Sequence, residues 1–217
     1  MSITNKLNNI KSQLPEQVTL VAVSKTKPLS DILEAYNTGH RIFGENKIQE
    51  MTEKHQELPK DIQWHMIGHL QRNKVKYMAS FVSLIHAVDN MKLLKEINKQ
   101  ALKHDRIINC LLQIKIAQED SKFGMSDQEA LEILKSQEFA ELKNINIVGL
   151  MGMATFTNNA EQLKKEFDYL KSTFGTIKAE YPEVNILSMG MSGDYELAID
   201  CGSNMIRVGS SIFGIRN

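Results

Sequence analysis

The sequence predicts an α/β fold, a single (β/α)8 TIM barrel with an extra N-terminal helix. Short apolar runs alternate with amphipathic helical segments from about residue 18 onward, and eight such runs occur. No glycine-rich dinucleotide-binding turn is present, which disfavours the main alternative, an open doubly wound sheet. No sequence repeat and no linker rich in Pro, Gly or Ser divides the 217 residues, so we expect one domain over residues 1–217.

The predicted strands are short runs of mainly apolar residues, the composition of parallel strands that are buried on both faces. The first run leaves the core through a short polar stretch that ends at Pro28, a residue that cannot continue a strand ladder. In chain order the predicted strands are Val18–Val23, Arg41–Glu45, Ile62–Ile67, Phe81–Ala87, Ile107–Ile116, Ile145–Met151, Asn185–Met189 and Asn204–Val208.

The predicted helices carry apolar residues three or four positions apart, as Leu163 and Phe167 do in the longest one. We expect Ser30 and Ser126 to cap helix N-termini and Gly39 to end a helix. The first helix is expected to cover the barrel wall. In chain order the predicted helices are Ile3–Leu14, Leu29–Tyr36, Lys47–Leu58, Gln71–Met78, Met91–His104, Asp127–Leu134, Ala160–Ile177 and Tyr195–Ile199.

The overall composition excludes several classes of protein. The net charge is zero, with 42% hydrophobic and 24% charged residues, whereas a nucleic-acid-binding protein needs a basic face. No apolar run approaches the roughly 18 residues of a membrane span, and the N-terminus lacks the apolar core of a signal peptide. Cys110 and Cys201 form no disulfide framework. We therefore expect a cytoplasmic protein, a monomer or weak dimer, that binds neither nucleic acid nor membrane.

Lys25 is the first candidate for chemistry because it follows the first predicted strand directly. Barrel active sites lie at the C-terminal ends of the strands. A lysine at that place loses water, which lowers its pKa, and Lys27, two residues on along the same face, lowers it further. A neutral amine can attack an aldehyde and form a Schiff base. The alternative is that both lysines are solvated residues at a strand end.

The loops after the seventh and eighth strands suit a phosphate group. Ser192 and Gly193 follow the seventh strand, and Gly209 and Ser210 follow the eighth. Glycines let the backbone approach an anion, serines donate hydroxyl groups, and these two loops are the usual phosphate site of the barrel fold. The alternative is that both loops are ordinary turns and helix caps.

Other polar residues on the predicted strands need partners. Arg207 lies near the end of a buried strand, so its charge requires either a carboxylate such as Glu45 or the nitrogen of a heterocycle. His65 and His69 have a spacing that suits zinc only on a helix, and no third ligand is evident, so we expect no metal. His69 is expected to face the barrel mouth and His86 the barrel interior.

These candidates belong to longer motifs that run in order from residue 20 to residue 214. On them the chain resembles the pyridoxal phosphate homeostasis proteins, a family with the fold of the alanine racemase N-terminal domain. The resemblance covers nearly the whole chain. The motifs are Ala22–Pro28, Phe43–Asn46 with Gln49 and Glu50, Trp64–Lys74, Gly149–Met151, Leu187–Ser192 and Arg207–Gly214.

The resemblance implies a cofactor and a set of site residues. The cofactor is pyridoxal 5′-phosphate, held by Lys25 as an internal aldimine, with Arg207 facing the pyridine nitrogen. An arginine does not readily give a proton to that nitrogen, so the ring is a weak electron sink. The other implied contacts are Ser192, Gly209 and Ser210 to the phosphate, and Asn46 and Met151 along the pocket wall.

The resemblance also implies a role without clear turnover. An alanine racemase continues into a C-terminal β domain that supplies a catalytic tyrosine, and this sequence stops at Asn217 with no second acid assigned. We therefore expect a protein that holds pyridoxal phosphate and releases it, with pyridoxal-phosphate-dependent apoenzymes as possible recipients. The alternatives are a weak amino-acid racemase, with Lys27, Lys122 or water as second proton donor, and a Schiff-base aldolase. The segment Asp120–Met125 is either a plain loop or a mobile lid that brings Lys122 to the site.

Overall fold

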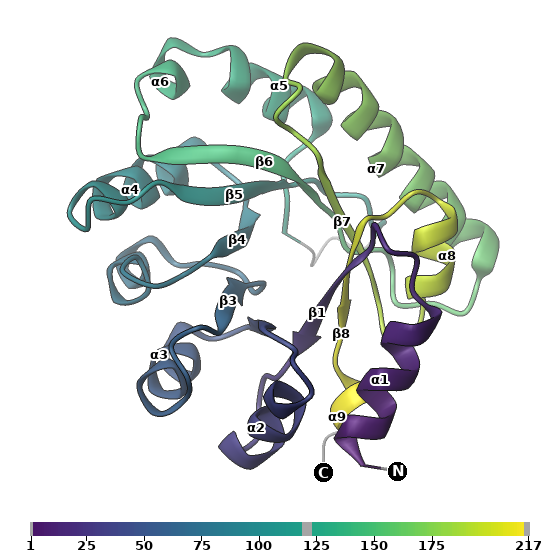
Figure 1. The fold of residues 1–217 in the computed structure, drawn as a ribbon. Helices are drawn as coiled ribbons and strands as arrows, with labels where there is room; N and C mark the ends of the chain where they lie inside the picture. Colours follow the sequence, from purple (N-terminus) through teal and green to yellow (C-terminus); the bar gives the residue numbers. More distant parts are fainter. Residues whose placement is uncertain (1, 119–122, 215–217) are drawn as a thin grey trace.

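Eight parallel strands close into a barrel in the order β1 to β8, as predicted. The computed structural model describes residues 2–118 and 123–214. Figure 1 shows the strands winding round the centre with helices outside them. The strands are β1 (Thr19–Val23), β2 (Ile42–Glu45), β3 (Gln63–Met66), β4 (Leu84–Val88), β5 (Ile108–Gln113), β6 (Ile145–Met151), β7 (Ile186–Met191) and β8 (Met205–Val208).

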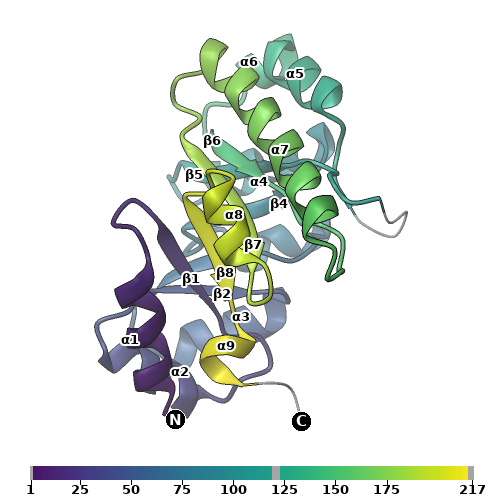
Figure 2. The ribbon, with the colours of Figure 1, turned by 90° about the vertical axis from the view of Figure 1, so that its right-hand side faces the viewer.

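The helices form the outer layer of the barrel. α1 packs beside α2 and α9, as Figures 1 and 2 show, and its Leu7 and Ile10 are buried. The helices are α1 (Ile3–Gln13), α2 (Leu29–Asn37), α3 (Ile48–Glu57), the 3₁₀ helix η1 (Arg72–Tyr77), α4 (Met91–Leu102), α5 (Asp127–Lys135), α6 (Gln137–Ala140), α7 (Ala160–Glu180), α8 (Tyr195–Asp200) and α9 (Ser210–Phe213).

Closure of the barrel sets the first and last strands side by side. β8 pairs with β1 in parallel register, with Val21 opposite Arg207 and Ala22 opposite Val208. Since side chains alternate between the two faces of a strand, Val21 and Arg207 both point into the barrel. Lys25 lies four residues after Val21, so the same alternation directs it toward the barrel interior beyond the end of β1.

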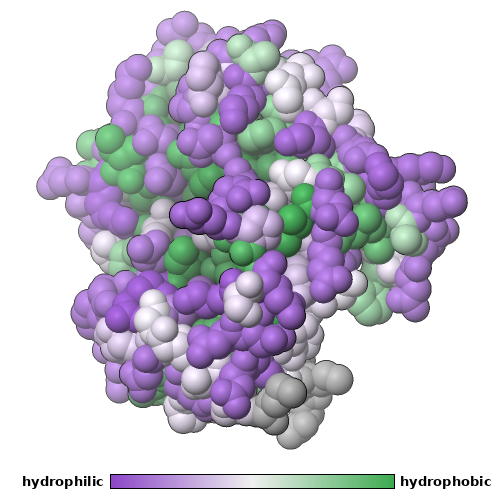
Figure 3. All heavy atoms as spheres, turned by 45° about the vertical axis from the view of Figure 1, so that its right-hand side comes forward, coloured by the Kyte–Doolittle hydropathy of each residue, from purple (hydrophilic) through white to green (hydrophobic). Residues whose placement is uncertain are grey.

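The apolar side chains form two clusters, one on each face of the strands. The larger cluster fills the space between the strands and the helices and includes Phe43, Trp64 and Phe167. The smaller cluster lies inside the barrel and includes Val21 and Met151. Polar side chains cover most of the face in Figure 3, and apolar ones gather in the hollows between them. In the part of the chain that the structure describes, no helix is long and apolar enough to cross a membrane.

The signals at the helix ends were predicted with mixed success. Ser126 forms a capping box with Glu129 at the start of α5, and Gly39 ends α2 with φ of +87°, as predicted. The predicted cap at Ser30 is wrong, because α2 begins at Leu29 with Pro28 in the N-cap position and no capping side chain. Proline fixes an extended residue directly before the helix, which leaves Ser30 already inside the first turn.

Three short helices differ from the prediction. The segment predicted as a helix over Gln71–Met78 is the 3₁₀ helix η1, which covers Arg72–Tyr77. The helices α6 and α9 were not predicted, and each has only four residues. A single helical turn is too short for a hydrophobic period to be recognised in a sequence.

Candidate functional site

A cavity of about 1020 Å³ opens at the C-terminal end of the barrel. Its walls come from residues at or just after the ends of β1, β2, β3, β5, β6, β7 and β8. All of the predicted site residues except Met151 line it. Those in the lining are Lys25, Asn46, Ser192, Arg207, Gly209 and Ser210.

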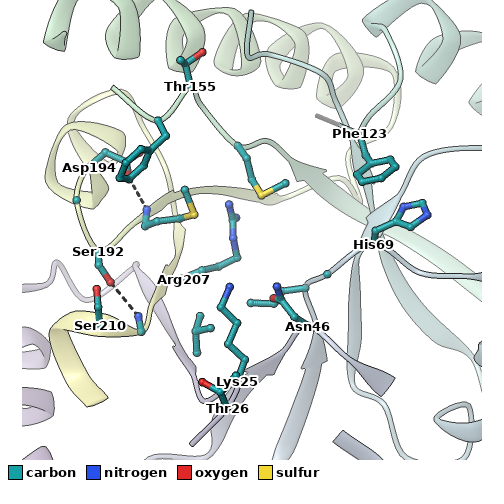
Figure 4. A pocket seen from close by; sticks show the side chains of 18 of the residues that line it. Lys25, Thr26, Asn46, His69, Phe123, Thr155, Ser192, Asp194, Arg207 and Ser210 are labelled. Carbon is teal, nitrogen blue, oxygen red and sulfur yellow. Dashed lines mark hydrogen bonds between the residues drawn. The ribbon is translucent and has the colours of Figure 1, made fainter. Parts of the chain in front are cut away.

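Lys25 projects from the turn after β1 into this cavity. Figure 4 shows its side chain directed toward Arg207, with Asn46 to one side. The two lysines of this turn have different surroundings, because the Lys27 amine donates a hydrogen bond to the carbonyl oxygen of Phe213 in α9, at 3.0 Å. Lys27 therefore ties the turn after β1 to the helix that follows β8.

The two loops predicted to hold a phosphate are joined to each other. The backbone N–H of Gly209 donates to the Ser192 hydroxyl oxygen at 3.1 Å, and Ser210 lies next to this contact (Figure 4). A Cβ atom at position 209 would lie 3.1 Å from the carbonyl oxygen of Val23. Gly209 thus lets the last loop pack closely against the end of β1, which sets Ser192 and Ser210 beside the turn that carries Lys25.

Arg207 is held inside the barrel by neutral groups. Its Nη1 donates to the Ser188 hydroxyl at 2.6 Å and its Nη2 to the carbonyl oxygen of Gly152 at 3.0 Å. Burial lowers the pKa of the guanidinium to about 10, so it stays charged near neutral pH. The predicted alternative of an ion pair with Glu45 is wrong. That carboxylate accepts from Lys54 at 2.8 Å, on the outer face of β2 that is turned away from the barrel interior.

Two buried histidines extend the hydrogen bonds of Arg207 across the barrel. His86 Nδ1 lies 3.1 Å from the Ser188 hydroxyl, and His65 Nδ1 lies 3.1 Å from His86 Nε2. Burial lowers the pKa of His65 to about 3 and that of His86 well below its usual value, so both rings are neutral. A neutral imidazole carries one N–H, so His86 donates to one of its two neighbours and accepts from the other. His86 faces the interior, as predicted.

The mouth of the cavity is aromatic on the side of β3. His69 lines it, as predicted, and stacks on Phe123 with 4.0 Å between ring centroids (Figure 4). The buried amide of Gln113 donates to the carbonyl oxygen of Phe123 at 2.9 Å and fixes this segment. Over residues 2–118 and 123–214 no group of His, Cys, Asp or Glu side chains could hold a metal.

The remaining sequence predictions have different outcomes. Met151 is fully buried in the cluster inside the barrel and does not line the cavity, whereas Met153 and Met191 do. Lys122 lies outside the described residues. Ser188 was missed as a functional residue, although a polar residue in a buried strand always needs a partner and is a usable signal.

Comparison with known proteins identifies the family. The model of the family described as "Alanine racemase, N-terminal domain" matches residues 1–217. A pyridoxal phosphate homeostasis protein of Vibrio alginolyticus is 36% identical over all of this chain and 98% of its own length. Proteins with the same name from Helicobacter pylori (40% identity, 90% of this chain and 87% of the relative) and Escherichia coli K12 (38%, 94% and 88%) are also similar.

Solved structures lead to the same family. PipY of Synechococcus elongatus without pyridoxal phosphate has a TM-score of 0.92 and 34% identity, covering 98% of this chain and all of that chain. PipY with pyridoxal phosphate bound has a TM-score of 0.89 and 33% identity over the same shares. An alanine racemase of Clostridium difficile has a TM-score of 0.80 at 16% identity, covering 99% of this chain and 56% of its own, so it shares the fold. The chain therefore belongs to the alanine racemase N-terminal domain family and, within it, to the pyridoxal phosphate homeostasis proteins.

Proposed function

We propose that this protein binds pyridoxal 5′-phosphate as a Schiff base on Lys25, holds it, and releases it to pyridoxal-phosphate-dependent apoenzymes without turnover of its own. One observation carries this proposal. A single cavity brings together an amine, a buried cation and a pair of joined Ser/Gly loops, namely Lys25, Arg207, and Ser192 with Gly209 and Ser210.

The donor set of the cavity fits the three functional groups of this cofactor. The Lys25 amine attacks the aldehyde carbon, the C=N bond replaces the C=O bond, and the oxygen leaves as water. The hydroxyl groups of Ser192 and Ser210 and the backbone at Gly209 suit phosphate oxygens. The guanidinium of Arg207 does not readily give up a proton, so it leaves the pyridine nitrogen unprotonated. PipY, a relative of similar length, has been solved with pyridoxal phosphate bound.

The surroundings of Lys25 favour holding over turnover. Racemisation needs a second acid or base on the opposite side of the substrate. Two ionisable side chains of the described lining already form hydrogen bonds with backbone groups. Lys27 donates to the carbonyl oxygen of Phe213, and the Asp194 carboxylate accepts the N–H of Met191 at 2.5 Å.

The two cysteines suit the cytoplasm as the compartment of this activity. Cys110 and Cys201 are both free and buried. Free thiols persist in a reducing compartment. We propose that the protein acts in the cytoplasm.

The test is the absorbance spectrum of the purified protein with added pyridoxal 5′-phosphate. A visible band is expected, and borohydride reduction followed by peptide mapping should place the modified amine at Lys25. Lys25→Ala should abolish the band, and Lys103→Ala, on the exposed end of α4, is the matched control. A band that persists unchanged in Lys25→Ala would overturn the Schiff-base assignment. Sustained conversion of any L-amino acid to its D-enantiomer would overturn the role without turnover.

A further inference from the structure

The turn that carries Lys25 has an unfavourable backbone conformation. Ser24 to Lys27 form a tight turn in which the Lys27 N–H donates to the carbonyl oxygen of Ser24 at 3.0 Å. Thr26, directly after Lys25, has φ of +65°. A β-branched residue in this left-handed region is a genuine outlier, since the conformation costs free energy that the surroundings must supply.

Three hydrogen bonds from neighbouring elements hold this turn on both sides of Lys25. The Thr26 N–H donates to Glu50 Oε1 at 2.5 Å. The carbonyl oxygen of Ser24 accepts from the Lys54 amine at 2.8 Å, and the Ser24 hydroxyl donates to Glu45 Oε1 at 2.5 Å. The backbone before and after Lys25 is therefore held by neighbouring elements on both sides.

A buried lysine organises these contacts. Lys54, in α3, is 5% exposed, and its three protons go to the carbonyl oxygen of Ser24, to Glu45 at 2.8 Å and to Glu50 at 2.7 Å. All three donors of the ammonium are thus used, which a buried charge requires. Glu50 is the outermost member of the group, with 22% of its side chain exposed. Lys54 holds the Glu50 carboxylate at the position where Thr26 needs an acceptor.

We infer that Glu50 is a positioning residue for Lys25. Its carboxylate, held by Lys54, binds the amide of Thr26 and stabilises the left-handed turn that presents the Lys25 amine to the cavity. This inference rests on the proposed Schiff base at Lys25. A turn that is ordered before the aldehyde arrives has less freedom to lose when the covalent bond forms, so the bond forms more favourably.

The test compares three substitutions of glutamates in α3. Glu50→Ala removes the acceptor, Glu50→Gln keeps an oxygen acceptor for the Thr26 amide, and Glu57→Ala changes an exposed glutamate at the far end of the same helix. The first readout is hydrogen exchange of the Thr26 amide in the cofactor-free protein, which Glu50→Ala should accelerate. The second is the equilibrium constant of Schiff-base formation, followed by absorbance, with pyridoxal 5′-phosphate and with pyridoxal.

We expect Glu50→Ala to lower the equilibrium constant about tenfold with both aldehydes, which is the loss of one charged hydrogen bond. Glu50→Gln should stay near the parent protein, as should Glu57→Ala. Pyridoxal lacks the phosphate, so an equal effect with both aldehydes locates the change at the amine. If Glu50→Ala does not fold, Glu50→Asp retains the charge beside Lys54 but shortens the reach to Thr26, and the same loss is expected.

Two further outcomes separate this inference from the proposed function. Parent and Glu50→Ala proteins with equal equilibrium constants would overturn the positioning role and leave the Schiff base on Lys25 intact. A parent protein that forms no adduct would overturn the proposed function, and the inference with it.

Discussion

Ser188 is a single hydroxyl group shared by two buried partners. It accepts from the guanidinium of Arg207 at 2.6 Å and lies 3.1 Å from His86 Nδ1. The group is fully buried. Ser188 therefore contributes to the stabilisation of Arg207, a buried cation that faces the cavity.

Ser188→Ala is expected to lower the free energy of unfolding by about 3 kcal/mol, because it leaves a charged donor and a histidine nitrogen buried without their partner. Urea denaturation measures this change. The control is Ser12→Ala at the exposed end of α1, where an effect within about 0.5 kcal/mol is expected. Equal stabilities of the Ser188→Ala and parent proteins would show that Arg207 does not depend on this contact.

The partner of Arg207 shows what a sequence can and cannot reveal about a site. The position of Arg207 on a buried strand correctly predicted that its charge needs partners. The choice of Glu45 failed because the two side chains lie on opposite faces of the barrel wall. Glu45 follows Phe43 on the outer face of β2, toward α3, whereas Arg207 follows Met205 on the inner face of β8. Alternation shows which residues of one strand share a face, but which face is the inner one is known only after the barrel has closed.

At the scale of elements, two glycines have opposite surroundings. Gly149 in β6 faces β7, and a Cβ there would lie 2.0 Å from the carbonyl oxygen of Ile186. Gly175 lies on the exposed side of α7, where a Cβ would meet no atom within 4 Å. The first glycine is required by the spacing of two strands, and the second only weakens a helix.

Gly149→Ala is expected to lower the free energy of unfolding by about 3 kcal/mol or more, because backbone atoms of β7 must move. Gly175→Ala is expected to raise it by about 0.5–1 kcal/mol through helix propensity and reduced freedom of the unfolded chain. Urea denaturation of both variants beside the parent protein measures the two changes. A Gly149→Ala protein as stable as the parent would mean that β6 and β7 are not held at the spacing described.

Elements with a strong hydrophobic period were the ones that the sequence predicted well. β6 and the start of α7 agree with the prediction to the residue, because an apolar run and a long amphipathic stripe define them. The start of β4 was predicted three residues too early, since Phe81 and Val82 are apolar but belong to the turn after η1. Composition cannot separate a buried turn from a buried strand, because both exclude water.

At the scale of the whole molecule, barrel closure explains why distant motifs share one site. β8 pairs with β1, so Arg207 and Gly209 come beside Lys25 although they are far from it in the chain. The count of eight strands predicted this juxtaposition, since the ends of all strands of a barrel meet at one face. The hydrogen-bond chain from Arg207 to His65 crosses the interior and could not be predicted, because it depends on side-chain geometry within the closed barrel.

Buried neutral histidines make the stability of the fold depend on pH. Burial lowers the pKa of His40 to about 4 and that of His65 to about 3, and it lowers the pKa of His86 well below its usual value. In the unfolded chain each histidine takes up a proton near pH 6.5. The unfolded state then binds protons that the folded state does not bind, so the stabilisation is complete above about pH 6.5 and decreases as the pH falls.

The free energy of unfolding should therefore fall between pH 7.5 and pH 5.5, by about 1.4 kcal/mol for each of the three histidines. Urea denaturation at the two pH values measures the fall. His40→Gln keeps a side-chain donor near the carbonyl oxygen of Ile42, which the ring contacts at 2.8 Å, and it removes one titrating group. Its fall should be smaller than that of the parent protein by about 1.4 kcal/mol. An equal fall in both proteins would mean that His40 takes up its proton as readily in the folded state as in the unfolded chain.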